Sequence, residues 1–305
     1  MSASNNTTAA LRFSGVYTAL VTPFTGEGED AGVAYDDLRR LIDFQIERGI
    51  AGISVVGTTG ESPTLTPSEH LEVIAKTVEY VNGRVPVLAG TGSNSTQEAL
   101  HFTREADKVG ADAFLIVAPY YNKPTPNGIY EHFHQLAEAT AKPIVLYSVP
   151  KRCGVEIAVE TVRRLRAKHR NIAAIKEASD SCARVSQFVR ELDSDFAVLS
   201  GEDALTLPFL SLGASGVVSV ASNWLPAEMS ALVNRFVAGD IAGALAEHKH
   251  LAEVFANIFI EVNPVPIKHV LARKKLITSS AVRLPLVSLE EKNAKLLDAL
   301  VDNFR

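Results

Sequence analysis

Short apolar runs alternate with segments of helical periodicity along most of the chain, and this alternation limits the folds open to it. The apolar runs, which we expect to be strands, are residues 16–21, 52–56, 85–89, 113–117, 143–147, 172–176, 196–200 and 216–220. Between them the apolar spacing follows the helical period, and we expect helices at residues 35–48, 68–81, 96–109, 127–140 and 158–168. Eight βα units with apolar strands predict a parallel sheet closed into a (β/α)₈ TIM barrel.

The open alternative is a doubly wound sheet, but no Gly-x-Gly-x-x-Gly motif follows an early strand. Polar residues suited to helix N-caps support the helical segments: Thr66 or Ser68, and Ser95. After about Pro226 the strands stop, and residues 227–238, 241–260 and 293–303 have helical patterns. We therefore expect a flexible tail at 1–13, a catalytic barrel at 14–226 and a small C-terminal helical region at 227–305.

Composition excludes several classes of function. The formal charge is −5 and the isoelectric point is near 5.9, so a nucleic-acid partner is not expected. No apolar stretch reaches the ~18 residues of a membrane span, and the polar start of the chain favours a frayed tail over an organelle-targeting remnant. Two cysteines suit a reducing cytoplasm without disulfides. Of the eight histidines, His132 and His134 point to different helix faces and His248 and His250 have the same spacing, so we expect no metal or cofactor.

Lys176 ends the apolar run Ile172-Ala173-Ala174-Ile175-Lys176, and no other lysine ends a strand-like run. Burial disfavours the charged form of an amine, and the neutral form attacks a ketone to make a Schiff base. The alternative is a lysine whose head extends from the strand end into water. In a barrel of this kind, catalytic groups gather at the carboxyl ends of the strands.

Other strand ends supply groups that suit the same chemistry. Gly57-Thr58-Thr59-Gly60-Glu61-Ser62 follows the second strand, where amides and hydroxyls could hold a carboxylate. Tyr120 and Tyr121 follow the fourth strand, and Tyr147 and Arg152 follow the fifth. An amine, a phenol that can carry protons and a carboxylate nest together suit a 2-oxo acid bound as an imine.

Three segments carry a resemblance to a known family. Gly57-Thr58-Thr59-Gly60-Glu61, Tyr147-x-Val149-Pro150-x-Arg152-x-Gly154 and Ile175-Lys176-Glu177 resemble the signatures of pyruvate-dependent class I aldolases, and within them the dihydrodipicolinate synthase family. The likeness runs from Gly15 to Pro285 and includes Asn263-Pro264-Val265-Pro266-Ile267-Lys268. Two residues depart from the family pattern: Ser148 stands where Asn is usual, and Cys153 where Thr or Ser is usual.

The resemblance implies a role for each matching residue. Lys176 would form the Schiff base with pyruvate, and the enamine would attack aspartate 4-semialdehyde. Thr58, Tyr147 and Tyr121 would relay protons, with Tyr121 reaching into a neighbouring subunit of a homotetramer. Thr59 would hold the pyruvate carboxylate, Gly201 and Val218 would line the site, and Arg152 would bind the carboxylate of the semialdehyde. An arginine at this position suits an amino-acid aldehyde better than a sugar chain.

Two other functions remain open on the sequence: an aldolase or dehydratase acting on 2-keto-3-deoxy sugar acids, and a barrel that binds a keto acid without catalysis. The resemblance also implies inhibition by lysine bound between subunits, at Ser62, Pro63, Pro67, His70, Asn94, Glu98 and Tyr120. Glu98 offers a carboxylate for the ammonium of lysine. Pro67 replaces a residue that is often a hydrogen-bond donor in the family.

Overall fold

The expected strands are all present and close into one parallel barrel, in a computed structural model that describes residues 11–26 and 31–304. They are β1 (Gly15–Ala19), β2 (Gly52–Val55), β3 (Val87–Gly90), β4 (Ala113–Val117), β5 (Ile144–Ser148), β6 (Ile172–Glu177), β7 (Ala197–Ser200) and β8 (Gly216–Ser219). Each strand pairs in parallel with the next one in sequence, and β8 pairs with β1. The predicted (β/α)₈ fold is therefore confirmed.

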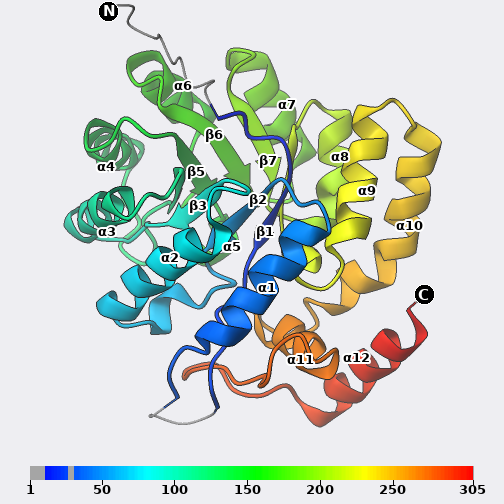
Figure 1. Cartoon of the computed structure of the whole chain (residues 1–305). Helices are drawn as coiled ribbons and strands as arrows, with labels where there is room; N and C mark the ends of the chain where they lie inside the picture. Colours follow the sequence, from blue (N-terminus) through cyan, green and yellow to red (C-terminus); the bar gives the residue numbers. More distant parts are fainter. Residues whose placement is uncertain (1–10, 27–30, 305) are drawn as a thin grey trace, which may run out of the picture.

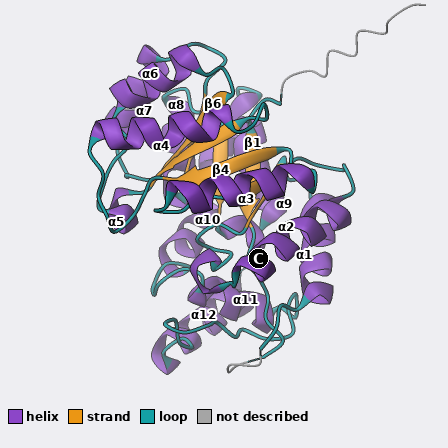
Figure 2. Ribbon diagram, turned by 90° about the vertical axis from the view of Figure 1, so that its left-hand side faces the viewer, coloured by secondary structure: helices purple, strands orange, loops and turns teal. Residues whose placement is uncertain are grey.

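Helices surround the strands and continue beyond the barrel (Figures 1 and 2). They are α1 (Tyr35–Glu47), α2 (Pro67–Val81), α3 (Thr96–Lys108), α4 (Pro126–Glu138), α5 (Pro150–Cys153), α6 (Val159–Lys168), α7 (Cys182–Glu191), α8 (Thr206–Ser211), α9 (Pro226–Val237), α10 (Ile241–Asn257), α11 (Val265–Arg273) and α12 (Glu291–Asn303). Short 3₁₀ turns lie at η1 (Ser62–Thr64), η2 (Asp203–Leu205) and η3 (Ala221–Asn223). Figures 1 and 2 show α11 and α12 together at one end of the barrel.

Local chemistry explains where these elements begin and pack. Almost every strand residue is buried, as expected for a parallel sheet covered on both faces. The expected caps are confirmed: Thr66 forms a capping box with Glu69, and the Ser95 side chain accepts from the Glu98 amide. At the closure of the barrel, a Cβ on Gly216 would lie 2.0 Å from the Gly15 carbonyl oxygen. Only glycine allows β1 and β8 to approach this closely.

The structure also corrects some boundaries. The third strand begins at Val87 instead of residue 85, because Pro86 has no N–H to give to a ladder. The Pro86 carbonyl still takes part in the sheet, because it accepts a hydrogen bond of 3.0 Å from the Ile53 amide. The sequence reasoning did not find α5, α7, α8 or α11. Most of the expected tail, residues 1–10, lies outside the described residues.

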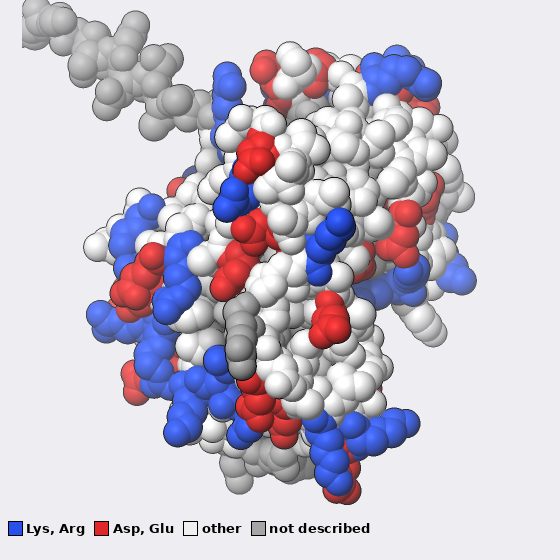
Figure 3. Space-filling view, turned by 90° about the vertical axis from the view of Figure 1, so that its right-hand side faces the viewer, with Lys and Arg blue, Asp and Glu red and all other residues white. Residues whose placement is uncertain are grey.

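The surface and helix lengths agree with the composition. No helix in the described part of the chain combines the length and apolarity needed to cross a membrane. Figure 3 shows one face of the molecule, on which basic and acidic side chains are interspersed. The basic side chains gather mainly towards the lower left of this view, with acidic side chains among them.

Candidate active site

The Lys176 amine lies near the carboxyl end of β6 and is largely shielded from water. In the sheet, Lys176 pairs with Tyr147 of β5 and Leu199 of β7, and only 6% of it is exposed. Its Nζ lies 4.3 Å from the centre of the Tyr147 ring. The other buried lysine, Lys268, is ion-paired with Glu61, whereas Lys176 makes no ion pair within the described residues. The structure thus brings the expected amine and phenol together and leaves the amine without a carboxylate partner.

Gly201 leaves space for the Lys176 side chain. Its amide donates to the Glu177 carbonyl at 2.8 Å, so the loop after β7 lies against the end of β6. A Cβ at Gly201 would lie 3.2 Å from Cε of Lys176 and 2.7 Å from Cβ of Ala178. A larger residue would therefore displace the lysine. Val218, another expected lining residue, lies buried in the wall of the barrel, on β8.

The loop after β2 forms a compact turn that presents two threonines. The amides of Glu61 and Ser62 donate back to the carbonyls of Thr58 and Gly57. Thr59 is buried and its Oγ1 accepts a hydrogen bond of 2.9 Å from Nδ2 of Asn263. Because this bond uses a lone pair, the Thr59 hydroxyl hydrogen is directed elsewhere and can be donated to a carboxylate.

A buried ion pair fixes this loop to the C-terminal region. Lys268 and Glu61 are both shielded from water, and the Lys268 ammonium also donates to the Ala281 carbonyl at 2.8 Å. Burial lowers the pKa of Lys268 to about 8, although Glu61 opposes this effect. The Arg283 amide donates to the second oxygen of Glu61, at 3.1 Å. The sequence reasoning missed this pair, because no local pattern connects the two residues.

Two acidic residues that follow β7 were also missed. Asp203 is buried and accepts hydrogen bonds from the Ser219 hydroxyl and from the amides of Val220 and Ala221, which lie at the end of β8. Burial raises the pKa of Asp203, and burial together with the Asp203 charge raises the pKa of Glu202 to about 7. The positive charge of Lys176 lowers both pKa values, so both carboxyls lie within its electrostatic range. Their position directly after a strand was the signal in the sequence.

Tyr121 and Arg152 lie at the rim. Tyr121 is 89% exposed and has a positive φ of 69°, which is uncommon for a residue other than glycine. In this single chain it does not pack into the barrel. Arg152 is exposed on α5, and within the described residues its guanidinium has no ion-pair partner. Both groups are therefore available to bind something outside the chain.

The two departures from the family pattern are both buried. The Ser148 hydroxyl accepts from the Ile157 amide at 3.4 Å. The Cys153 thiol donates to the Ala118 carbonyl at 3.3 Å, and burial raises its pKa to about 11. Both groups therefore serve the packing of β5 and α5.

The residues expected to bind lysine lie on the segments that follow β2, β3 and β4. Ser62 and Pro63 lie in η1, Pro67 and His70 on α2, Glu98 on α3, and Asn94 and Tyr120 in loops. Glu98 accepts from the Ser93 hydroxyl, the Asn94 carbonyl accepts from the Asn122 side chain at 2.9 Å, and Ser62 and Tyr120 are half-buried. His70 is buried, its Nε2 lies 2.8 Å from the Gly90 carbonyl, and its ring stacks on Phe102 at 4.2 Å. Desolvation lowers the pKa of His70. His70 thus supports the wall of this region, and Glu98 is the exposed anion.

A shielded amine at the end of a barrel strand and beside a tyrosine ring is an arrangement that suits Schiff-base chemistry. The fold and the site define a lyase of the class I aldolase type. The model of the Dihydrodipicolinate synthetase family matches residues 12–303. The chain belongs to this family.

Individual relatives agree over nearly their full length. The 4-hydroxy-tetrahydrodipicolinate synthase of Syntrophus aciditrophicus is 48% identical over 293 residues, which cover 96% of this chain and 98% of the relative. The dihydrodipicolinate synthase of Acinetobacter baumannii, solved in complex with pyruvate, has a TM-score of 0.91 and 39% identity, covering 95% of this chain and 98% of that structure. The enzyme of Cyanidioschyzon merolae, solved with lysine bound, also has a TM-score of 0.91 and 39% identity, with coverage of 95% and 97%.

Proposed function

We propose that the chain condenses pyruvate with L-aspartate 4-semialdehyde to 4-hydroxy-tetrahydrodipicolinate, in the diaminopimelate route to lysine. One observation carries the proposal: the Lys176 amine is buried, lies 4.3 Å from the centre of the Tyr147 ring and has no ion-pair partner within the described residues. The names of the relatives supply the product, and one solved relative was bound to pyruvate. The semialdehyde is what the family resemblance implies. The reaction would take place in the cytoplasm.

The chemistry balances with this one amine. Lys176 attacks C2 of pyruvate and water leaves, which gives an imine. Loss of a proton from C3 gives an enamine, whose C3 attacks the aldehyde carbon and forms the new C–C bond. The amino group of the semialdehyde then attacks C2 and displaces the lysine, which closes the ring and regenerates the enzyme.

Side chains at the strand ends would assist these steps. Thr58, Tyr147 and Tyr121 would carry the protons that the imine and enamine steps release and consume. The Thr59 hydroxyl and the surrounding loop would hold the pyruvate carboxylate. Since Tyr121 is exposed in the single chain, its part in the relay would come from a neighbouring subunit of a homotetramer.

Arg152 would select the second substrate. Its exposed guanidinium can pair bidentately with the carboxylate of the semialdehyde. An enzyme that acts on 2-keto-3-deoxy sugar acids would not need this cation at the rim. Comparing turnover of pyruvate with aspartate semialdehyde and with sugar-derived aldehydes separates the two functions.

Borohydride reduction in the presence of pyruvate tests the imine directly. We expect the added mass on the peptide that contains Lys176 and parallel loss of activity, and Lys176→Ala should lose most of its turnover. Lys268 is an internal control, because it is buried but held by Glu61 and Ala281. Label on Lys268, or no label, would refute the proposal.

A further inference from the structure

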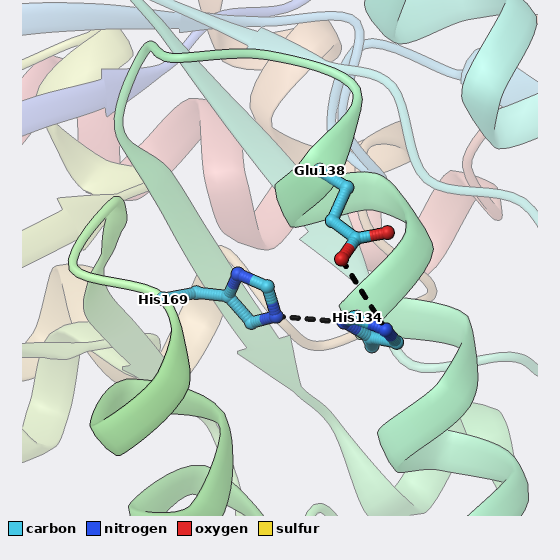
Figure 4. Close-up of side chains that lie close together, drawn as sticks. All are labelled: His134, Glu138 and His169. Carbon is cyan, nitrogen blue, oxygen red and sulfur yellow. Dashed lines mark hydrogen bonds and ion pairs between the residues drawn. The ribbon is translucent and has the colours of Figure 1, made fainter.

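Two histidines and a glutamate from separate elements meet on the outside of the barrel. His134 and Glu138 lie four residues apart on α4, and His169 follows α6 (Figure 4). Nδ1 of His134 lies 2.7 Å from Nε2 of His169, and Nε2 of His134 lies 3.5 Å from a Glu138 oxygen. Each of the three residues offers one potential ligand atom, and these three atoms all lie within 4.8 Å of one another. Sequence reasoning compared histidines that are close in sequence and therefore missed this group.

The backbone around this cluster is already held in place. The Asn171 side chain donates to the carbonyls of Ala137 and Thr140, at 2.9 and 2.8 Å, so the loop that carries His169 is fixed to the end of α4. The Ile172 amide donates to the His169 carbonyl at 3.1 Å. Because the frame is formed without any ligand, little ordering is needed to bring the three side chains together.

We propose that His134, His169 and Glu138 form a binding site for one divalent transition-metal ion, with zinc as the representative. Two imidazoles and a carboxylate suit zinc or its neighbours better than magnesium or calcium, which prefer oxygen ligands alone. Three protein ligands leave a fourth position for water. Nitrogens bound to a tetrahedral zinc lie about 3.3 Å apart, so the histidine pair needs to open by only about 0.6 Å. Glu138 is 58% exposed on its side chain and can turn towards the ion.

Lys168 competes with the metal in this arrangement. Its Nζ lies 3.2 Å from Nε2 of His134, and an ammonium only donates, so Nε2 accepts and Nδ1 donates its hydrogen to His169. A metal that binds Nδ1 of His134 and Nε2 of His169 displaces the hydrogen from Nδ1 of His134, and this hydrogen then lies on Nε2 of His134. The exposed Lys168 then turns into solvent. Removal of this ammonium should strengthen metal binding.

The site is separate from the chemistry. His169 precedes β6, which begins at Ile172, and Lys176 lies near the carboxyl end of the same strand. The four steps from Ile172 to Lys176 alone span about 13 Å. A metal here would connect α4 to the connection between α6 and β6. It would stabilise the fold without contacting a substrate.

Zinc titration of the chelator-treated protein tests the site, with calorimetry for stoichiometry and the melting temperature as a second readout. The background carries Cys182→Ser, because an exposed thiol is itself a potential zinc ligand. We expect one zinc per chain and a higher melting temperature. His169→Gln and Glu138→Gln should each weaken binding at least about a hundredfold, since loss of an outer-shell partner alone costs 10–100-fold. Lys168→Met should strengthen it.

His101→Gln is the matched control, because this exposed histidine lies on α3, outside the cluster. It should bind zinc like the parent. The d–d absorption of bound cobalt gives an independent spectroscopic readout that should be lost in both ligand variants. Absence of saturable binding in the parent would overturn the proposal. Equal binding in His169→Gln, Glu138→Gln and His101→Gln would do so as well.

Discussion

Replacing Lys268 by Met should destabilise the protein, because it breaks the buried ion pair with Glu61. Lys268 and Glu61 are 0% and 2% exposed, so Met keeps the volume but leaves a buried carboxylate without its ammonium. Removal of one partner of a buried ion pair costs about 3–5 kcal/mol. The Arg283 amide still donates to Glu61, so we expect the lower end of this range, about 3 kcal/mol. At roughly 2 °C per kcal/mol for a large chain, the melting temperature should fall by about 6 °C.

The double variant Lys268→Met/Glu61→Gln distinguishes two causes of destabilisation: the unpaired Glu61 carboxylate and the loss of its contact with Lys268. It removes the unpaired carboxylate, so it should recover part of the lost stability. Because Glu61 belongs to the turn that presents Thr59, the single variant should also raise the KM for pyruvate. Thermal denaturation and steady-state kinetics give both readouts. If the melting temperature of Lys268→Met falls by less than about 2 °C, the ion pair stabilises the fold by less than its burial implies. If the double variant is as unstable as the single variant, the unpaired carboxylate is not the cause of the destabilisation.

Four further changes give separate tests. Arg152→Ala should cost about 1.5–3 kcal/mol, or ten- to a hundredfold, in kcat/KM for the semialdehyde while borohydride labelling with pyruvate stays intact; equal damage to both would assign Arg152 to the fold. Lysine at millimolar concentration or below should inhibit the enzyme partially, and Glu98→Ala should abolish this inhibition while turnover persists. A wild-type enzyme that is unaffected by tens of millimolar lysine would contradict lysine binding between subunits. Hydrogen bonding to Arg283 lowers the pKa of Glu69 to about 2, so this pair stabilises the fold above about pH 4.5 and its contribution is lost as the pH falls towards 2. Glu69→Gln should flatten the acid-unfolding curve in that window, and an unchanged curve would exclude the pair as its cause. Burial raises the pKa of Glu202 to about 7, so Glu202→Gln should remove a titration near pH 7 from the pH profile of imine formation; an unchanged profile would exclude Glu202 as its source.

The fold was predictable because each strand carries its own signal. A buried parallel strand is apolar throughout, and the helical period between strands is visible without any knowledge of neighbours. Two of the helices that were missed are too short to show a period, since α5 and α8 span four and six residues. The other two do carry the signal: α7 buries Val185 and Phe188, three residues apart, and α11 buries Ile267, Val270 and Leu271 at helical spacing. Their pattern was present in the sequence and was overlooked.

The residues of the candidate site also fall into those that the sequence predicts and those that only the structure reveals. Lys176, Tyr147 and Thr59 were found because each lies at a strand end, where barrel topology determines its neighbours. Glu61 and Lys268 lie 207 residues apart, and His134 and His169 lie 35 apart. Only the packing of the whole chain brings such pairs together. The role proposed for Tyr121 needs a subunit contact, and such a contact has no pattern in the sequence of a single chain.

The bonds that complete the loop after β2 have a consequence for synthesis of the protein. Thr59 receives its hydrogen bond from a residue 204 positions later, and Glu69 binds a guanidinium 214 positions later. A ribosome that has released all eight strands has therefore not yet supplied the partners of this loop. The nascent chain should acquire pyruvate-binding capacity only after residue 283 emerges. Shortening the C-terminus past this point should abolish substrate binding even if the barrel forms.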